Sequence, residues 1–455
     1  MTKKLSWKQT LLLVSLIFGM FFGAGNLIFP VHLGQLAAGH WLPATIGFVL
    51  SATMVPLLAL IAFSTSKSES IFDLVKPLGG GLAIFFLIAV HVTMGPLVAT
   101  PRAASIVYSL SFANWLPQGI QGVSQVVFFV LYFGLLYWVG VQKQSLTVII
   151  GKYLNPIFIV LLAFIFILGI LHPMGSLEHV ASAEYQRHAF TAAFLEGYNT
   201  VDIFSSLIFG ISIVQAINAM GFHGSQTTGK IIAKTGTFAM LGLALFYLGL
   251  ILLGATSLGK LTVSDNGAQG LTQIVTYYLG SFGQAFLAVT AFLAVFTSAM
   301  GLTSSFAQDF HKIFPKVSYK VWLAFTVILA FLVANLGLDN IIAWTMPFLI
   351  FLYPLAIVLT ILGLLAPWLG RDKILYQTTM FFTLFPAILD GLVRAPFAKS
   401  IGHLVGYLDQ AGHLHPGLYQ ELLPGASVGF GWVLPAIIGF ALGLILSRYH
   451  NKKAN

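Results

Sequence analysis

The 455-residue sequence contains no cysteine and very little charge. Without cysteine, the chain can form neither a disulfide framework nor a thiolate metal site. Only 8% of its residues are Asp, Glu, Lys or Arg, against about 25% in a typical soluble domain. Because 58% of the residues are hydrophobic, the composition excludes an ordinary soluble protein and predicts an integral membrane protein.

The residue patterns of an intramembrane enzyme are also missing. The sequence has no HExxH segment and no pair of membrane aspartates placed for catalysis. Its polar residues form isolated clusters instead of the hydrated stripe that an ion channel would show along several helices. We therefore expect a protein that is not an enzyme, and we keep a channel only as the less favoured alternative.

Apolar runs of about 20 residues, the length that crosses a bilayer, recur along the whole chain. We expect an all-α polytopic membrane protein, with residues 1–455 forming one membrane domain. Twelve transmembrane helices are predicted near 9–38, 41–63, 82–111, 121–140, 146–171, 190–218, 233–257, 282–309, 320–337, 341–366, 375–394 and 430–448.

The positive charge is concentrated on one side of this predicted topology. With the N-terminus in the cytoplasm, the cytoplasmic side receives all of the 22 lysines and arginines except Arg102, Arg187, Lys260, Arg394 and Lys399. This is the positive-inside distribution, and it accounts for the net charge of +9 without a nucleic-acid partner. An even number of spans then places the C-terminus in the cytoplasm as well.

The first apolar segment is interrupted by GMFFGAGNLIFP, residues 19–30. Glycine costs about 1 kcal/mol inside a helix, and proline removes a backbone donor. In lipid, the freed backbone groups need protein, water or an ion as partners. Close helix packing is one interpretation. We favour a helix that is broken around a ligand, with candidate substrate-binding residues Phe21, Phe22, Gly23, Ala24, Gly25 and Asn26.

The sixth segment carries a second polar cluster, FLEGYNTVDIFSSLIFG, residues 194–210. An acidic residue at bilayer depth costs about 2.5–3.5 kcal/mol on the insertion scale. Asp202 could bond a neighbouring helix, but the polar residues around it favour an ion or substrate pathway. The break could centre on 197–202 or on 205–210. The candidate substrate-binding residues here are Tyr198, Asn199, Thr200, Asp202, Ser205 and Ser206.

These two interrupted segments lie five spans apart, so the second enters the membrane from the opposite side. That is the arithmetic of an inverted repeat, with a binding site where the broken helices meet. We expect the first five-helix repeat over 9–171, the second over 190–366 and two further helices over 375–448.

Three further features concern polar residues in the third and eighth segments. His91 is interpreted as a hydrogen-bonded packing residue, and a buried Arg102 must snorkel or find a partner. The eighth segment has the hydroxyl pairs Thr297/Ser298 and Thr303/Ser304. Such hydroxyls usually bond the preceding turn, but they are also suitable ligands for sodium. The first pair lies nearer mid-span.

Together, GAGNLIFP, GPLVATPR, FLEGYNTVD and the Thr-rich eighth segment resemble the branched-chain amino acid:cation symporters of bacteria. The resemblance covers essentially the whole chain, and this family is distantly similar to the neurotransmitter:sodium symporter-like fold. It implies two inverted five-helix repeats with broken helices 1 and 6, in the bacterial inner membrane. It further implies sodium-coupled import of leucine, isoleucine and valine.

The matching Gly25-Asn26 step implies that the carbonyls of Gly19 and Phe22 bind sodium together with Thr297 and Ser298, with Thr303 and Ser304 as the less favoured pair. The segment Leu-Ile-Phe-Pro departs from the symporter pattern because it is one residue shorter and lacks an arginine, so the outer gate must be built differently.

A proton-coupled carrier that uses Asp202 is the main alternative. We expect no cofactor besides the coupling ion. The expected partners are a branched-chain amino acid and the lipid bilayer, without nucleic acid or an obligate protein partner.

Overall fold

The computed structural model describes residues 5–68, 70–112, 116–142, 160, 162–409 and 413–454. The described chain is mostly helical, as the apolar runs predict. Its one small sheet pairs β1 (Tyr407–Leu408) with β2 (Leu414–His415) in antiparallel orientation. The first part of the predicted span 146–171 lies outside the described residues.

The helices before residue 172 include two that change winding partway. A single turn of π-helix, η2 (Leu50–Met54), connects α3 to α4, and a second one, η4 (Thr93–Leu97), connects α6 to α7. The α-helices of this part are α1 (Trp7–Phe21), α2 (Ala24–Ala37), α3 (Trp41–Val49), α4 (Val55–Thr65), α5 (Ile71–Val75), α6 (Gly80–Val92), α7 (Ala99–Ser111), α8 (Gln118–Val141) and an apolar helix Leu162–Leu171.

The rest of the chain contains longer helices and a folded connection. These elements are α10 (Ala183–Glu196), the 3-10 turn η5 (Gly197–Thr200), α11 (Asp202–Ala219), α12 (Ser225–Ser257), α13 (Gly267–Ile313), α14 (Tyr319–Ala334), α15 (Leu338–Leu369) and α16 (Lys373–Val393). The connection that follows holds α17 (Gly402–Val405) and α18 (Leu418–Leu422), and α19 (Val433–Ala454) ends the described chain.

Seven described helices are long and apolar enough to cross a membrane, or eight if the bent pair Asp202–Gly210 and Ser212–Ala219 counts as one span. The protein is therefore a multi-pass membrane protein. One of the seven, Ala24–Thr65, runs through α2, α3 and α4, and other predicted spans are assembled from shorter helices. The count of twelve and the division into inverted repeats remain predictions.

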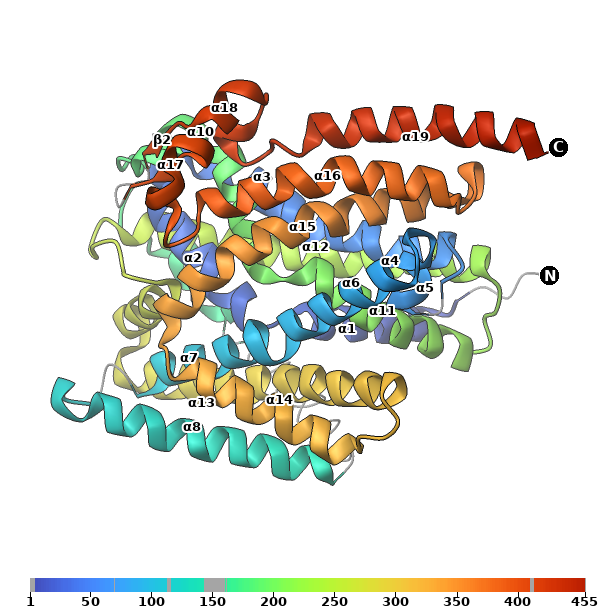
Figure 1. Ribbon diagram of the computed structural model, residues 1–455. Coiled ribbons are helices and arrows are strands. Elements are labelled where there is room, and N and C mark those ends of the chain that lie inside the picture. The colour runs from blue at the N-terminus through green and yellow to red at the C-terminus, as the bar shows by residue number, and fades with distance from the viewer. Residues whose placement is uncertain are drawn as a thin grey trace.

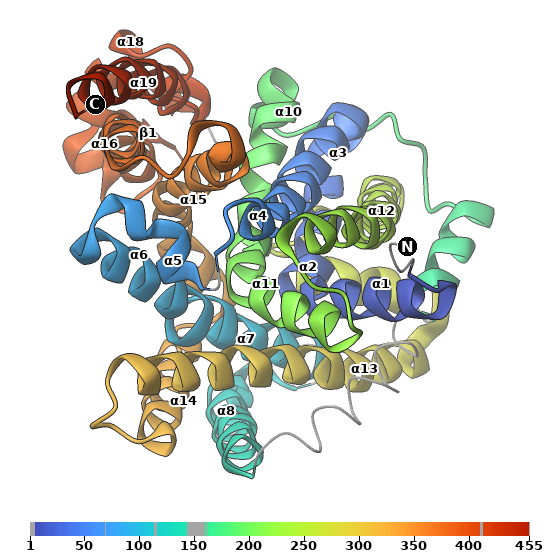
Figure 2. The ribbon, with the colours of Figure 1, turned by 90° about the vertical axis from the view of Figure 1, so that its right-hand side faces the viewer.

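The interrupted helices lie in the middle of the bundle. Viewed along the helices, α2, α7 and α11 are central, α8 and α14 are on one side, and α16 and α19 are on the other (Figure 2). Packing contacts join α12 to α2, α13 to α7 and α10 to α3. The start of α1 and the end of α19 lie at the same end of the molecule (Figure 1).

The outer faces of the peripheral helices are apolar and exposed. Leu131 on α8, Ile328 on α14, Phe381 on α16 and Ile445 on α19 are examples of large exposed hydrophobic side chains. In water such a surface would be unfavourable, so it is the surface expected for contact with lipid. The polar residues at the interruptions of the helices, in contrast, are buried inside the bundle.

A cavity between two broken helices

The first helix is broken at the glycine-rich stretch, as its sequence predicts. Helix α1 ends at Phe21, Phe22 and Gly23 are extended, and α2 begins at Ala24. The amide of Gly23 donates to the side-chain oxygen of Asn26 at 3.4 Å. Since the last carbonyls of a helix and the first amides of the next have no partner within their own helix, the break exposes acceptors at the end of α1 and donors at the start of α2.

The sixth predicted span is broken between Glu196 and Asp202. The 3-10 turn Gly197–Thr200 follows α10, and Val201 adopts a left-handed conformation with φ of 56° before α11 begins. A β-branched residue at positive φ is a strained exception that the surrounding structure must hold. The break therefore lies within residues 197–202, the first of the two predicted positions, and not within 205–210. A further bend of 43° separates Asp202–Gly210 from Ser212–Ala219.

The two breaks touch each other at Gly25. A Cβ atom added there would lie 3.1 Å from the carbonyl oxygen of Asn199 and 3.2 Å from the ring of Phe29. Both contacts are tighter than a Cβ atom usually makes, so a residue without a side chain accommodates this close approach best. Gly25 is therefore explained by the contact between the breaks, whereas a Cβ on Gly23 would meet only ordinary contacts.

A buried hydrogen-bonded triad beside the two breaks links α2, α11 and α12. The side-chain nitrogen of Asn26 donates to Oδ2 of Asp202 at 2.8 Å, and the hydroxyl of Tyr247 on α12 donates to the same oxygen at 3.2 Å. All three side chains are buried. An aspartate in the membrane interior is tolerated only with such partners, so the triad fixes the relative position of the two breaks.

A cavity of about 50 Å³ lies between the breaks. Among the predicted site residues, its lining includes Phe21, Gly23, Ala24, Gly25, Asn26, Thr200, Asp202 and Ser205. Other walls come from Met94 before α7, Arg102 on α7, Phe209 on α11 and Leu302 on α13. The lining is thus mainly apolar, with one cationic side chain, one acidic side chain and a few hydroxyls.

Four predicted binding residues lie beside the cavity without lining it. Phe22 stacks on Phe18, and Tyr198 stacks on Tyr353 with ring centroids 3.9 Å apart. The hydroxyl of Ser206 donates to the carbonyl of Pro56 at 2.9 Å. Asn199 presents its main-chain carbonyl to Arg102. These residues shape the walls through packing and main-chain contacts.

Three residues of this site were not predicted from the sequence: Arg102 as a cavity residue, Tyr247 and Val201. A charge inside an apolar span is a signal of function, so Arg102 could have been found. Tyr247 carries no such signal, because a tyrosine in an apolar segment usually indicates the membrane interface. Nothing in the local sequence marks Val201, since its β-branched side chain disfavours the conformation it adopts.

The hydroxyls proposed for sodium lie on α13, which forms one wall. Of the four, Ser298 lines the cavity, and Thr297 donates to the carbonyl of Ala294 at 2.7 Å. Thr303 is buried and donates to the carbonyl of Ala299 at 2.9 Å, and Ser304 is half-buried. Each threonine thus makes the bond to the preceding turn that is usual in helices, which leaves its oxygen lone pairs available to a cation.

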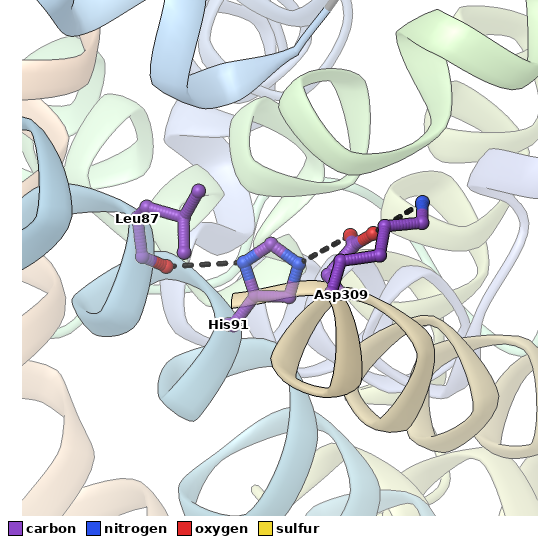
Figure 3. Close-up of polar contacts among 4 residues, drawn as sticks. Leu87, His91 and Asp309 are labelled. Atoms are coloured by element: carbon purple, nitrogen blue, oxygen red, sulfur yellow. Dashed lines mark hydrogen bonds and ion pairs between the residues drawn. The ribbon is translucent and has the colours of Figure 1, made fainter. Parts of the chain in front are cut away.

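Away from the cavity, a second polar contact joins α6 to α13. His91 on α6 lies between the carbonyl of Leu87, 3.0 Å from Nδ1, and Oδ2 of Asp309 on α13, 2.9 Å from Nε2 (Figure 3). Because a carbonyl can only accept, Nδ1 is the donor to Leu87. His91 is therefore the hydrogen-bonded packing residue that was expected, with Asp309 as its partner.

The whole chain matches known proteins. Residues 6–450 match the family described as "Branched-chain amino acid transport protein". The branched-chain amino acid permease BrnQ of Bacillus subtilis is 31% identical, over 99% of this chain and 100% of its own. The branched-chain amino acid transport system 2 carrier protein of Pseudomonas aeruginosa is 35% identical, over 96% of this chain and 95% of its own.

Among solved structures, the fold is similar to Mhp1, a nucleobase-cation-symport-1 family transporter. The TM-score is 0.50 at 13% sequence identity, with 97% of this chain and 92% of that chain covered. This likeness concerns the fold alone. The matches along its full length show that the chain is a member of the branched-chain amino acid transport protein family, and its fold is similar to that of Mhp1.

Proposed function

We propose that the protein imports leucine, isoleucine and valine by sodium-coupled symport, with alternating access to the cavity between the breaks. The observation that carries this proposal is the composition of the cavity lining, in which Arg102 and Asp202 face a mainly apolar space. A branched-chain amino acid is a zwitterion with an apolar side chain. Its two charged groups and its side chain thus each find a complementary part of the wall.

The polarity of the broken helices also favours a substrate whose carboxylate faces α2, with a cation near the end of α1. The N-terminus of α2, at Ala24, carries free amides and the positive end of a helix dipole, which favour a carboxylate. The C-terminus of α1, at Phe21, carries free carbonyls and the negative end, which favour a cation. Sodium bound to the carbonyls of Gly19 and Phe22 and to hydroxyls of α13 would therefore lie beside the substrate.

The size of the cavity also supports alternating access. About 50 Å³ holds a few water molecules and less than a molecule of leucine. Substrate entry therefore requires the walls to separate on one side, which is what alternating access provides. One sodium ion that crosses 100 mV supplies about 2.3 kcal/mol, enough for roughly fifty-fold accumulation before its chemical gradient is counted.

A proton-coupled carrier is the second candidate, because Asp202 is a buried carboxyl group that accepts a hydrogen bond from Asn26, in the first turn after the break between α1 and α2. Uptake of labelled leucine into proteoliposomes, with sodium and proton gradients imposed separately, decides between the two. We expect a sodium gradient alone to drive accumulation and a proton gradient alone to fail. The reverse result would support the carrier that uses Asp202, and equilibration without accumulation would contradict coupled import.

A further inference from the structure

Arg102 is a buried cation with one part of its guanidinium group unused. Its side chain is 2% exposed, so it does not snorkel to the membrane surface. Nη2 donates to the carbonyl oxygen of Asn199 at 2.5 Å, and the guanidinium carbon lies 5.0 Å from the centre of the Phe29 ring. Nη1 is buried and finds no hydrogen-bond partner among the residues that the structure describes.

Such an unpaired donor is costly in this environment. Leaving a buried hydrogen-bonding group without a partner destabilises the protein, and the effect is larger for a charged group. The carbonyl of Asn199 and the cation–π contact with Phe29 compensate only part of this cost. Because Arg102 lines the cavity, the missing acceptor is best supplied by a ligand in that space.

The chemistry of the ligand follows from the fixed geometry of arginine. A guanidinium group presents its N–H donors in a planar fork that matches a carboxylate, and hydrogen bonds of this kind are stronger than those between neutral groups. The lining residues Ala24 and Gly25 belong to the first turn of α2, whose free amides also favour an anion. The acidic residue of the lining, Asp202, is already bonded through Oδ2 to Asn26 and Tyr247.

We propose that Arg102 binds the α-carboxylate of the substrate through Nη1, while the first amides of α2 bind the same group from the other side. The inference rests on the proposed transport of branched-chain amino acids and names the residue that recognises their common carboxylate. Since Nη2 is held by the carbonyl of Asn199 in the break between α10 and α11, Arg102 connects the substrate's carboxylate to that break, and the amides of α2 connect it to the break between α1 and α2.

The test compares leucine with leucinamide, which keeps the side chain and the ammonium but replaces the carboxylate by a neutral amide. Dissociation constants of both ligands are measured by calorimetry on the purified full-length protein at constant sodium concentration. For the unaltered protein we expect leucinamide to bind at least about 100-fold more weakly, the cost of losing a charge-assisted pair.

In Arg102→Gln, leucine should bind about 100-fold more weakly and leucinamide nearly as before, so that the two affinities converge. Arg102→Lys keeps the charge without the fork and should give an intermediate ratio. Arg187→Gln removes an exposed arginine and should change neither affinity.

Equal losses of both ligands in Arg102→Gln would overturn the inference and give Arg102 a purely structural role. If that variant does not fold, the unaltered protein still decides, because leucinamide binding within threefold of leucine would exclude a carboxylate anchor. A protein that binds no leucine at all would instead contradict the proposed function.

Discussion

The side-chain nitrogen of Asn26 lies 2.8 Å from Oδ2 of Asp202, although 176 positions separate the two residues in the chain. Asn26 lies in the first turn of α2, directly after the break between α1 and α2, and Asp202 begins α11, directly after the break between α10 and α11. The bond holds the two irregular segments against one cavity. A ligand in that cavity is therefore recognised by both breaks together.

Asp202→Asn tests the role of the acidic group in this pair. The variant keeps the shape and an acceptor for Asn26 and Tyr247 but removes the charge that would face the substrate's ammonium. We expect the protein to fold and the affinity for leucine, measured by calorimetry, to fall by about tenfold or more, because a charge-assisted hydrogen bond contributes about 1.5–3 kcal/mol.

Ser206→Ala is the matched control, since Ser206 is buried one turn away and bonds the carbonyls of Pro56 and Asp202 outside the cavity. It should lower the melting temperature and leave leucine affinity unchanged. An Asp202→Asn protein that binds leucine as tightly as the unaltered protein would exclude the carboxylate from substrate binding.

The sodium site is tested by removing single hydroxyl groups from α13. Thr297→Val keeps the size of the side chain, and we expect it to raise the sodium concentration needed for half-maximal leucine binding with little change in melting temperature. The same assay on Thr303→Val distinguishes the two pairs. If Thr303→Val alone removes sodium dependence, the pair Thr303/Ser304 is the site, and if neither variant matters, sodium does not bind at α13.

The contact between His91 and Asp309 should stabilise the fold. Asp309→Ala leaves Nε2 of buried His91 without its partner, which costs about 1–3 kcal/mol. We expect a clearly lower melting temperature. Lys312→Gln is the control, because that side chain is 75% exposed and its ion pair with Asp309 is worth little. Equal melting temperatures for the two variants would show that the buried contact contributes nothing measurable.

Topology can be tested directly because the chain has no cysteine of its own. Single cysteines at Lys8 and Arg448 should resist an impermeant thiol reagent in intact cells, since both termini are predicted to be cytoplasmic. A cysteine at exposed Lys260 should react. Labelling at Lys8 or Arg448 from outside would reverse the predicted orientation.

The break between α1 and α2 was predictable because its cause is local. Glycines, an asparagine and a proline within residues 19–30 all disfavour a continuous helix. The break between α10 and α11 was harder to place, because the residue that turns the chain is Val201, whose side chain disfavours a positive φ. Its conformation is imposed by packing, so the sequence left two positions open.

The partners within the site could not be predicted from the sequence. The bond between Asn26 and Asp202 depends on the packing of distant helices, and Tyr247 is recognisable only once α12 is seen to lie against α2. Arg102 is visible as a charge in an apolar span, but its partner is the main-chain carbonyl of Asn199. A carbonyl has no side-chain signature, so the pair emerges only from the folded structure.

The central claim, that the cavity between the breaks binds the substrate, is tested most directly at Gly23. This residue is extended, with φ of −117°, and a Cβ atom there meets no close contact. Gly23→Leu should therefore fold while its side chain occupies the cavity. At Gly25 an added side chain would press on the carbonyl of Asn199, so Gly25→Leu should also destabilise the protein.

The measurement is the increase in melting temperature that leucine produces in each purified variant, since a ligand that binds the native state must raise it. Gly134→Leu, at an exposed position of α8 with open space around it, serves as the control. We predict that Gly134→Leu keeps the full leucine-induced increase and that Gly23→Leu, with a melting temperature near that of the unaltered protein, loses it. A full increase in Gly23→Leu would contradict the account and place the substrate elsewhere.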